Sequence, residues 1–131
     1  MIKGFVCGSW DLLHVGHLIL LEKCKDKCDY LLVGLHVDPN VERRGKNKPI
    51  ESIFERLMRL KSCKFVDGVI IYETEVELEV ILRNMDIDIR FLGTDYDGDK
   101  RITAEDAVEI CYIDRHHNYS TTELRERIKN G

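Results

Sequence analysis

Short apolar segments alternate with stretches of helical periodicity along this chain of 131 residues. The apolar segments have the length of buried strands and lie at residues 2–7, 30–35, 66–71, 89–92 and 108–113. Helices are expected at residues 18–24, 52–62, 76–85 and 120–129, and a short turn or helix is expected before the fifth strand. This alternation predicts an α/β fold, a single doubly wound, Rossmann-like sheet of five parallel strands with helices on both faces.

Length and composition favour one domain that covers residues 1–131, because 44% of the residues are hydrophobic and suffice for one core. Acidic and basic residues are interspersed and the net charge is −4, so no nucleic-acid partner is expected. The apolar runs are shorter than the roughly 18–20 residues of a membrane-spanning helix, and the first residues lack the pattern of a signal peptide. The chain is therefore expected to be cytoplasmic and not inserted in a membrane.

Two details of packing can be predicted from residue spacing. The five cysteines are an odd number without a CxxC pair, which argues against a disulfide framework and a zinc ribbon. Cys24 and Cys28, four residues apart, are expected to pack as small apolar side chains rather than to bind a metal. In the helix at 76–85, the residues expected to face inward are Val76, Val80, Ile81 and Met85.

Ligands of such a sheet bind beyond the carboxyl ends of the strands, where the strand order reverses. Polar segments lie there at residues 8–17, 38–49, 93–101 and 115–122. The first contains His14 just before, and His17 just inside, an expected helix start, where backbone N–H groups and the helix dipole attract anions. The pair therefore favours a phosphate chain over zinc, since a hydrolytic zinc site needs a third ligand and the HExxH motif has a spacing of four.

Residues 8–17 read GSWDLLHVGH and resemble the signature GTFDLLHxGH of the HxGH nucleotidyltransferase superfamily, in particular the cytidylyltransferases and among them the glycerol-3-phosphate cytidylyltransferases. Arg115 with Ser120-Thr121-Thr122 resembles the RTEGISTT segment of the same family. The resemblance implies transfer of CMP from CTP to a small phosphomonoester, first glycerol 3-phosphate, with release of pyrophosphate and with Mg²⁺ on the triphosphate. Such an enzyme supplies alignment and positive charge rather than a nucleophile.

The resemblance also implies roles for individual residues. Catalysis and triphosphate binding are assigned to His14, His17, Lys46 and Arg115. Further nucleotide contacts are assigned to Ser9, Trp10, Gly16, Lys48, Gly93, Asp95, Ser120, Thr121 and Thr122. Acceptor binding is assigned to Arg44, Arg56 and Asp11. Two other roles stay open for Asp11, a ligand to Mg²⁺ and a turn cap, and no further protein ligand to the metal is expected.

Some features leave the function open. Residues 116–118 replace the family's T-E-G, and residues 75–78 lack a tryptophan and a substrate-binding lysine of the glycerol-phosphate enzymes. An adenylyltransferase of the same superfamily, resembling FAD synthase or using a sugar or pantetheine phosphate, is one alternative. A non-catalytic nucleotide-binding module is another.

Family members of this size are commonly homodimers, and the helix with Arg56 is an expected interface. Ser120 and Glu123 are expected to form a capping box.

Overall fold

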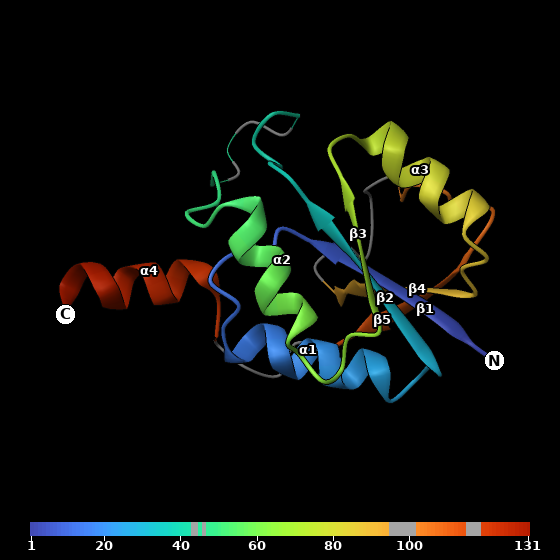
Figure 1. Ribbon diagram of the computed structural model, residues 1–131, viewed down its shortest axis with the longest axis horizontal. Coiled ribbons are helices and arrows are strands. Elements are labelled where there is room, and N and C mark those ends of the chain that lie inside the picture. Colours follow the sequence, from blue (N-terminus) through green and yellow to red (C-terminus); the bar gives the residue numbers. More distant parts are fainter. Residues whose placement is uncertain (43–44, 46, 95–101, 115–118) are drawn as a thin grey trace.

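The computed structural model describes residues 1–42, 45, 47–94, 102–114 and 119–131. Within these residues, five parallel strands form one sheet: β1 Lys3–Gly8, β2 Tyr30–His36, β3 Gly68–Tyr72, β4 Ile89–Gly93 and β5 Glu109–Ile113. Their order across the sheet is β3-β2-β1-β4-β5 (Figure 1). The predicted Rossmann-like sheet is confirmed, and its strand order reverses between β1 and β4, where the ligand crevice of such folds lies.

The described residues also form four helices: α1 Val15–Lys25, α2 Ile53–Lys61, α3 Glu75–Asn84 and α4 Thr121–Asn130. Helices α1 and α2 lie on one face of the sheet and α3 lies on the other, whereas α4 projects away from the sheet (Figure 1). The four predicted helices are confirmed, with ends that differ by a few residues. Among the residues described, no helix is both long enough and apolar enough to cross a bilayer.

Side chains alternate between two cores along the central strands. On β2, Leu31, Val33 and Leu35 belong to the core under α1 and α2, whereas Leu32 belongs to the core under α3. This explains the nearly continuous apolar sequence of the strand, since both faces of a parallel sheet are covered. Position 34 is glycine because a Cβ there would lie 2.6 Å from the Phe5 ring.

The inward face of α3 differs from the prediction. Val76 and Val80 are 70% and 55% exposed, whereas Leu78, Ile81 and Leu82 are buried. The buried residues are spaced three and four apart and form one stripe of the helix, which the sheet covers. Apolar residues surround more than half of this helix, so the spacing alone could not identify the buried stripe.

Cys24 packs in the core as predicted. It is fully buried against the residues under α1 and α2, and burial raises the pKa of its thiol. Cys28 lies beyond the end of α1, and its thiol donates a hydrogen bond to the Cys24 carbonyl over 3.3 Å. Both cysteines are therefore packing residues.

Candidate active site

A cavity of about 460 Å³ opens at the carboxyl ends of the central strands. Its walls come from the end of β1, the start of α1, the ends of β2 and β4, and the first turns of α3 and α4. The volume is within the range of small-molecule pockets, about 300–1,000 Å³. All four predicted ligand-side segments therefore contribute described residues to one cavity, the last of them through Thr121.

His14 and His17 stand at the start of α1 and line this cavity. Their rings are stacked, with centroids 3.9 Å apart. His14 is the N-cap residue, and its Nδ1 accepts a hydrogen bond from the backbone N–H of Gly16 over 3.1 Å. Nδ1 of His17 accepts one from the backbone N–H of His14 over 3.2 Å. The two rings thus cap the helix in place of the usual serine and glutamate.

These caps fix the tautomers of both histidines. A nitrogen that accepts a hydrogen bond carries no proton, so each neutral ring holds its proton on Nε2. Nε2 of His14 lies 3.2 Å from Oγ1 of Thr121, at the start of α4. Nε2 of each ring therefore lies on the side away from the α1 backbone as a donor, that of His14 next to Thr121. A donor is the polarity that a phosphate oxygen requires.

The turn between β1 and α1 is held in a strained conformation. Trp10 and Leu12 have φ angles of 54° and 60°, in the left-handed region that residues other than glycine rarely adopt. The Trp10 side chain is buried, and its Nε1–H donates to the carbonyl of Gly34 over 3.0 Å. Its ring packs against that of His17 in an edge-to-face arrangement, with centroids 5.3 Å apart. The buried indole of Trp10 therefore holds His17, one ring of the histidine pair, in place.

Asp11 connects this turn to the loop before α2. Its Oδ1 accepts from the backbone N–H of Glu51 over 2.9 Å, and its Oδ2 accepts from that of Ile50 over 2.9 Å. Arg125 of α4 donates to the same Oδ2 over 3.1 Å. Asp11 is only 3% exposed, so its carboxylate acts as a buried link among three segments that surround the cavity.

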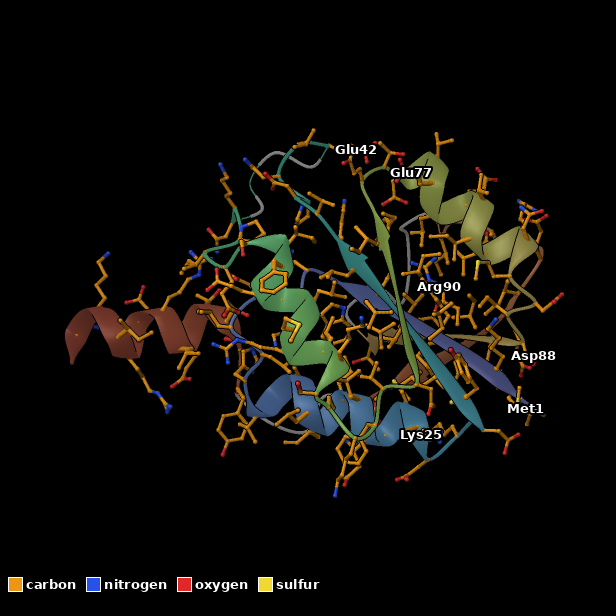
Figure 2. All side chains as sticks on the ribbon, viewed as in Figure 1. Met1, Lys25, Glu42, Glu77, Asp88 and Arg90 are labelled. Carbon is orange, nitrogen blue, oxygen red and sulfur yellow. The ribbon has the colours of Figure 1, made fainter. Side chains whose placement is uncertain are left out.

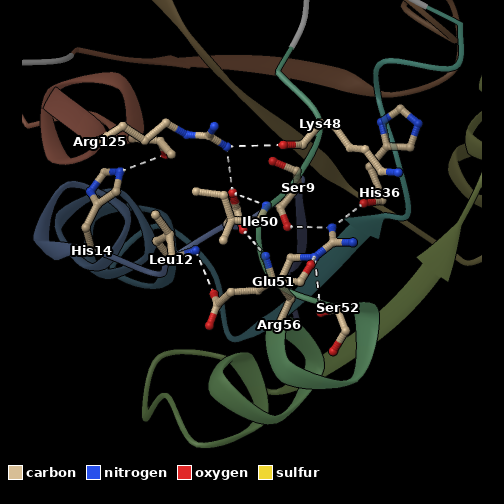
Figure 3. A network of polar contacts seen from close by, with 12 residues as sticks. Ser9, Leu12, His14, His36, Lys48, Ile50, Glu51, Ser52, Arg56 and Arg125 are labelled. Atoms are coloured by element: carbon tan, nitrogen blue, oxygen red, sulfur yellow. Dashed lines mark hydrogen bonds and ion pairs between the residues drawn. The ribbon is translucent and has the colours of Figure 1, made fainter. Parts of the chain in front are cut away.

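Arg56 of α2 is also a buried link (Figure 3). Its guanidinium donates to the carbonyls of Ser9, His36 and Val37 over 3.0, 2.8 and 2.7 Å, which joins the loops after β1 and β2. Its Nε donates to the carbonyl of Glu51 over 3.2 Å. Burial lowers the pKa of Arg56. The structure thus places Arg56 in the framework of the loops, and the acceptor contact expected for it stays a prediction.

The start of α4 contributes Thr121 and Arg125 to the cavity wall. Ser120 caps the helix by accepting from the backbone N–H of Glu123 over 3.0 Å. This is one half of the predicted capping box, because the Glu123 carboxylate pairs with Arg127 over 3.3 Å. Thr122 is exposed on the outer side of the helix.

The remaining predicted residues are placed as follows. Gly16 and Gly93 both line the cavity, and a Cβ on Gly93 would meet nothing within 4 Å. Lys48 is exposed, and its carbonyl accepts from Arg125 over 3.2 Å. Four predicted site residues lie outside the described part of the chain: Arg44, Lys46, Asp95 and Arg115.

With this geometry established, comparison with known proteins gives the family. The model of the cytidylyltransferase-like family matches residues 5–127. This chain belongs to the cytidylyltransferase-like family. The predicted membership of the nucleotidyltransferase superfamily is thereby confirmed, whereas a particular closeness to the glycerol-3-phosphate enzymes is not shown.

Curated relatives of this family member include the bifunctional protein HldE from Campylobacter jejuni, 38% identical over 96% of this chain. HldE from Helicobacter pylori is 37% identical over 95% of it. The chain spans about a quarter of the length of these proteins, 27% in both cases.

Solved structures agree with the family fold. A lipopolysaccharide core biosynthesis protein from Thermoplasma volcanium has a TM-score of 0.72 and 28% identity, with 89% of this chain and 99% of that chain covered. Pantothenate synthetase from Thermus thermophilus has a TM-score of 0.61 and 16% identity over 97% of this chain and 64% of that one, which shows the fold alone.

The sequence reasoning missed several residues that line the cavity of this family member. They are Lys23, His36, Tyr72, Glu75, Arg90 and Arg125. Arg90 could have been identified from the sequence, because a charged residue inside an apolar strand is unusual and needs a buried partner. Arg125 could also have been identified, since it follows Thr121 by one helical turn and therefore lies on the same face of the helix.

Proposed function

We propose that this chain is a nucleotidyltransferase that moves a nucleoside monophosphate from a nucleoside triphosphate to a small phosphomonoester and releases pyrophosphate. The observation that carries the proposal is the stacked pair of His14 and His17, whose Nδ1 atoms are both held by backbone N–H groups. The pair places two Nε2–H donors at the start of α1, on the side of the rings away from the backbone, and the helix dipole there also favours phosphate.

The proposed reaction is an in-line displacement at the α-phosphorus. An oxygen of the acceptor phosphate forms a bond to the α-phosphorus while the bond to the leaving pyrophosphate breaks. Negative charge grows on the phosphate oxygens, and the imidazole N–H groups stabilise it without transferring a proton. Lys23 and Arg125 also line the cavity and add positive charge. These residues bind and align the two substrates.

Mg²⁺ enters this scheme as part of the nucleotide substrate. Both carboxylate oxygens of Asp11 already accept hydrogen bonds from the protein, so Asp11 does not suit the role of metal ligand. Among the described residues, no group of three or more His, Cys, Asp or Glu side chains could hold a metal ion. We therefore assign no step to a metal bound by the protein.

CTP is the first nucleotide to test, because the family model that matches is cytidylyltransferase-like. ATP is the second, since the histidine pair contacts phosphates and does not read a base. For the acceptor, glycerol 3-phosphate comes first from the sequence resemblance. A sugar phosphate is supported by the similarity to a lipopolysaccharide core biosynthesis protein.

The deciding experiment measures pyrophosphate release and ³¹P NMR spectra with CTP and ATP offered separately against a panel of phosphomonoesters. His14→Ala should lower turnover by at least about a hundredfold, since donors to developing charge contribute on that order. Val15→Ala, at the next position of α1 and 45% exposed, is the matched control and should stay active. Nucleotide binding without turnover on any acceptor would favour the non-catalytic module instead.

A homodimer is proposed on separate grounds. Phe54 and Met58 are 67% and 48% exposed and lie one turn apart on α2, and Ile50 just before the helix is 60% exposed. Large apolar side chains gathered in one area are typical of a protein interface. We propose that a second copy of this chain covers this part of α2.

A further inference from the structure

One end of the cavity lies on the face of the sheet that α3 covers. One side chain from each of four adjacent strands lines the cavity there: Tyr72 of β3, His36 of β2, Cys7 of β1 and Arg90 of β4. Glu75, the first residue of α3, lines it from the helix. Because α1 and α3 pack on opposite faces, this end is separate from the histidine pair of α1 (Figure 1).

Arg90 has more donors than partners among the described residues at this end. It is 7% exposed and lies below α3 in Figure 2. One terminal nitrogen donates to the carbonyl of Thr103 over 3.1 Å, and the other approaches Sγ of Cys7 over 3.6 Å, a weak acceptor. Its buried Nε has no hydrogen-bond partner among the residues that the structure describes. Buried polar atoms are nearly always paired, so this arginine is suited to a ligand oxygen.

Glu75 supplies the opposite charge on the same network. Its Oε2 accepts from the hydroxyl of Thr103 over 2.9 Å, and the carbonyl of Thr103 accepts from Arg90. Among the described residues that line this end of the cavity, Arg90 is the cation and Glu75 the anion. Hydroxyl groups both donate and accept, so they can pair with both residues. A second anionic group would be repelled by Glu75, and an ammonium group would be repelled by Arg90.

Tyr72 and His36 make a flat wall beside these charges. Their rings are stacked, with centroids 4.6 Å apart and planes 18° apart. Nε2 of His36 lies 3.1 Å from the carbonyl of Glu73, which keeps the imidazole in place. Burial raises the pKa of Tyr72, so the phenol stays neutral. A flat aromatic wall next to Arg90 and Glu75 suits a carbon chain or ring that carries hydroxyl groups.

We infer that Arg90 and Glu75 select the acceptor by hydrogen bonding to the hydroxyl groups of a polyol or sugar phosphate. The inference rests on the proposed nucleotidyl transfer and adds the residues that recognise the acceptor.

The test compares Glu75→Gln with Glu79→Gln, the same change on the same helix at a residue that is 43% exposed and pairs with Arg83. Glu75→Gln should raise the KM for glycerol 3-phosphate or a hexose 1-phosphate about tenfold, since a charged hydrogen-bond partner is lost. The KM for the nucleotide should change less than about twofold, because the nucleotide is bound at the other end. Glu79→Gln should leave both KM values unchanged.

Calorimetric titration provides a second measurement that does not require turnover. Glycerol 3-phosphate and a hexose 1-phosphate should bind more tightly than phosphoethanolamine and 3-phosphoglycerate, and Glu75→Gln should remove the preference. Arg90→Gln should do the same, and thermal unfolding together with nucleotide binding checks that this variant folds. Tighter binding of phosphoethanolamine or phosphoglycerate overturns the inference, as does an unchanged preference in Glu75→Gln. Selective binding without turnover contradicts the proposed reaction and leaves the acceptor site standing.

Discussion

The guanidinium of Arg125 lies 3.1 Å from the carboxylate of Asp11, although 114 residues separate them in the sequence. The same arginine donates to the carbonyl of Lys48 over 3.2 Å. It thereby joins α4 to the turn after β1 and to the loop before α2. Since α4 has no buried residue, these contacts and that of Thr121 with His14 hold the start of the helix against the cavity.

Replacing Arg125 by leucine should therefore affect ligand binding more than folding. We expect the Kd for the nucleoside triphosphate to rise about tenfold, because a partly buried positive charge at the cavity is lost. The midpoint of thermal unfolding should fall by no more than a few degrees, which corresponds to a loss on the order of 1 kcal/mol in the free energy of unfolding. Calorimetric titration and thermal denaturation measure the two effects.

Arg127→Leu is the matched control for this prediction. Arg127 also lies on α4 and pairs with Glu123, but its side chain is 59% exposed. The Arg127→Leu variant should leave the Kd for the nucleoside triphosphate unchanged. Equal weakening of nucleotide binding by the two variants would show that α4 acts through its overall charge rather than through Arg125.

Arg56→Met should destabilise the protein strongly. The variant leaves the carbonyls of Ser9, His36 and Val37 without their donor, so a loss of about 3 kcal/mol is expected. Urea denaturation measures it. Arg59→Met removes an arginine of the same helix that is 56% exposed, and should cost about 1 kcal/mol or less. Similar losses for both would refute the role of Arg56 as a buried link.

The contact of Asp67 with Lys25 predicts a dependence of stability on pH. Burial disfavours the charged Asp67, but hydrogen bonds from Lys25 and from the N–H of Leu31 outweigh it and lower its pKa below the ordinary 3.8. A carboxyl whose pKa is lowered by folding stabilises the protein at pH values above its pKa in the unfolded chain. This contribution is lost as the pH falls through its pKa in the folded protein.

Asp67→Asn should consequently lose about 1 kcal/mol at pH 7, a modest amount because both side chains are partly exposed. The difference from the natural chain should be the same at pH 5 and should shrink below the ordinary pKa of the carboxyl. Urea unfolding at pH 7, 5 and 3 measures it. A difference that widens on acidification would contradict the assignment.

Both histidines of the HxGH segment should be Nε2–H tautomers when neutral. Nδ1 of His14 and Nδ1 of His17 each accept from a backbone N–H, which excludes a proton there. Long-range ¹H–¹⁵N NMR correlations distinguish the two ring nitrogens by their shifts. Detection of an Nδ1–H proton on either ring would remove the basis for two phosphate donors at the start of α1.

A glutamate at Phe54 should separate the proposed homodimer, because a charge would be buried in the interface. Sedimentation velocity of the natural chain should give a dimer and that of Phe54→Glu a monomer. Val80→Glu, at a position 55% exposed on α3, is the control and should remain dimeric. A natural chain that sediments as a monomer at high concentration rejects the proposal.

The sequence was sufficient to predict the order of strands and helices along the chain, because burial on both faces of the sheet gives a central strand such as β2 a nearly continuous apolar run. It also located the histidine pair, since the helix start after the first strand is specified by local residues. The contacts that hold the site together could not be predicted in the same way. Asp11 and Arg125, or Arg56 and the carbonyl of His36, are remote in sequence and become neighbours only when the loops meet.

The alternation of side chains along β1 has a consequence for how related chains can diverge. Val6 belongs to the core under α1 and α2, whereas the next residue, Cys7, packs with the core under α3. Inserting or deleting one residue in this strand would exchange the two sides and disrupt both cores at once. We therefore expect differences in length among related chains to lie in the connecting loops. Single substitutions at every second strand position can change the wall beside α3 while the histidines stay in place.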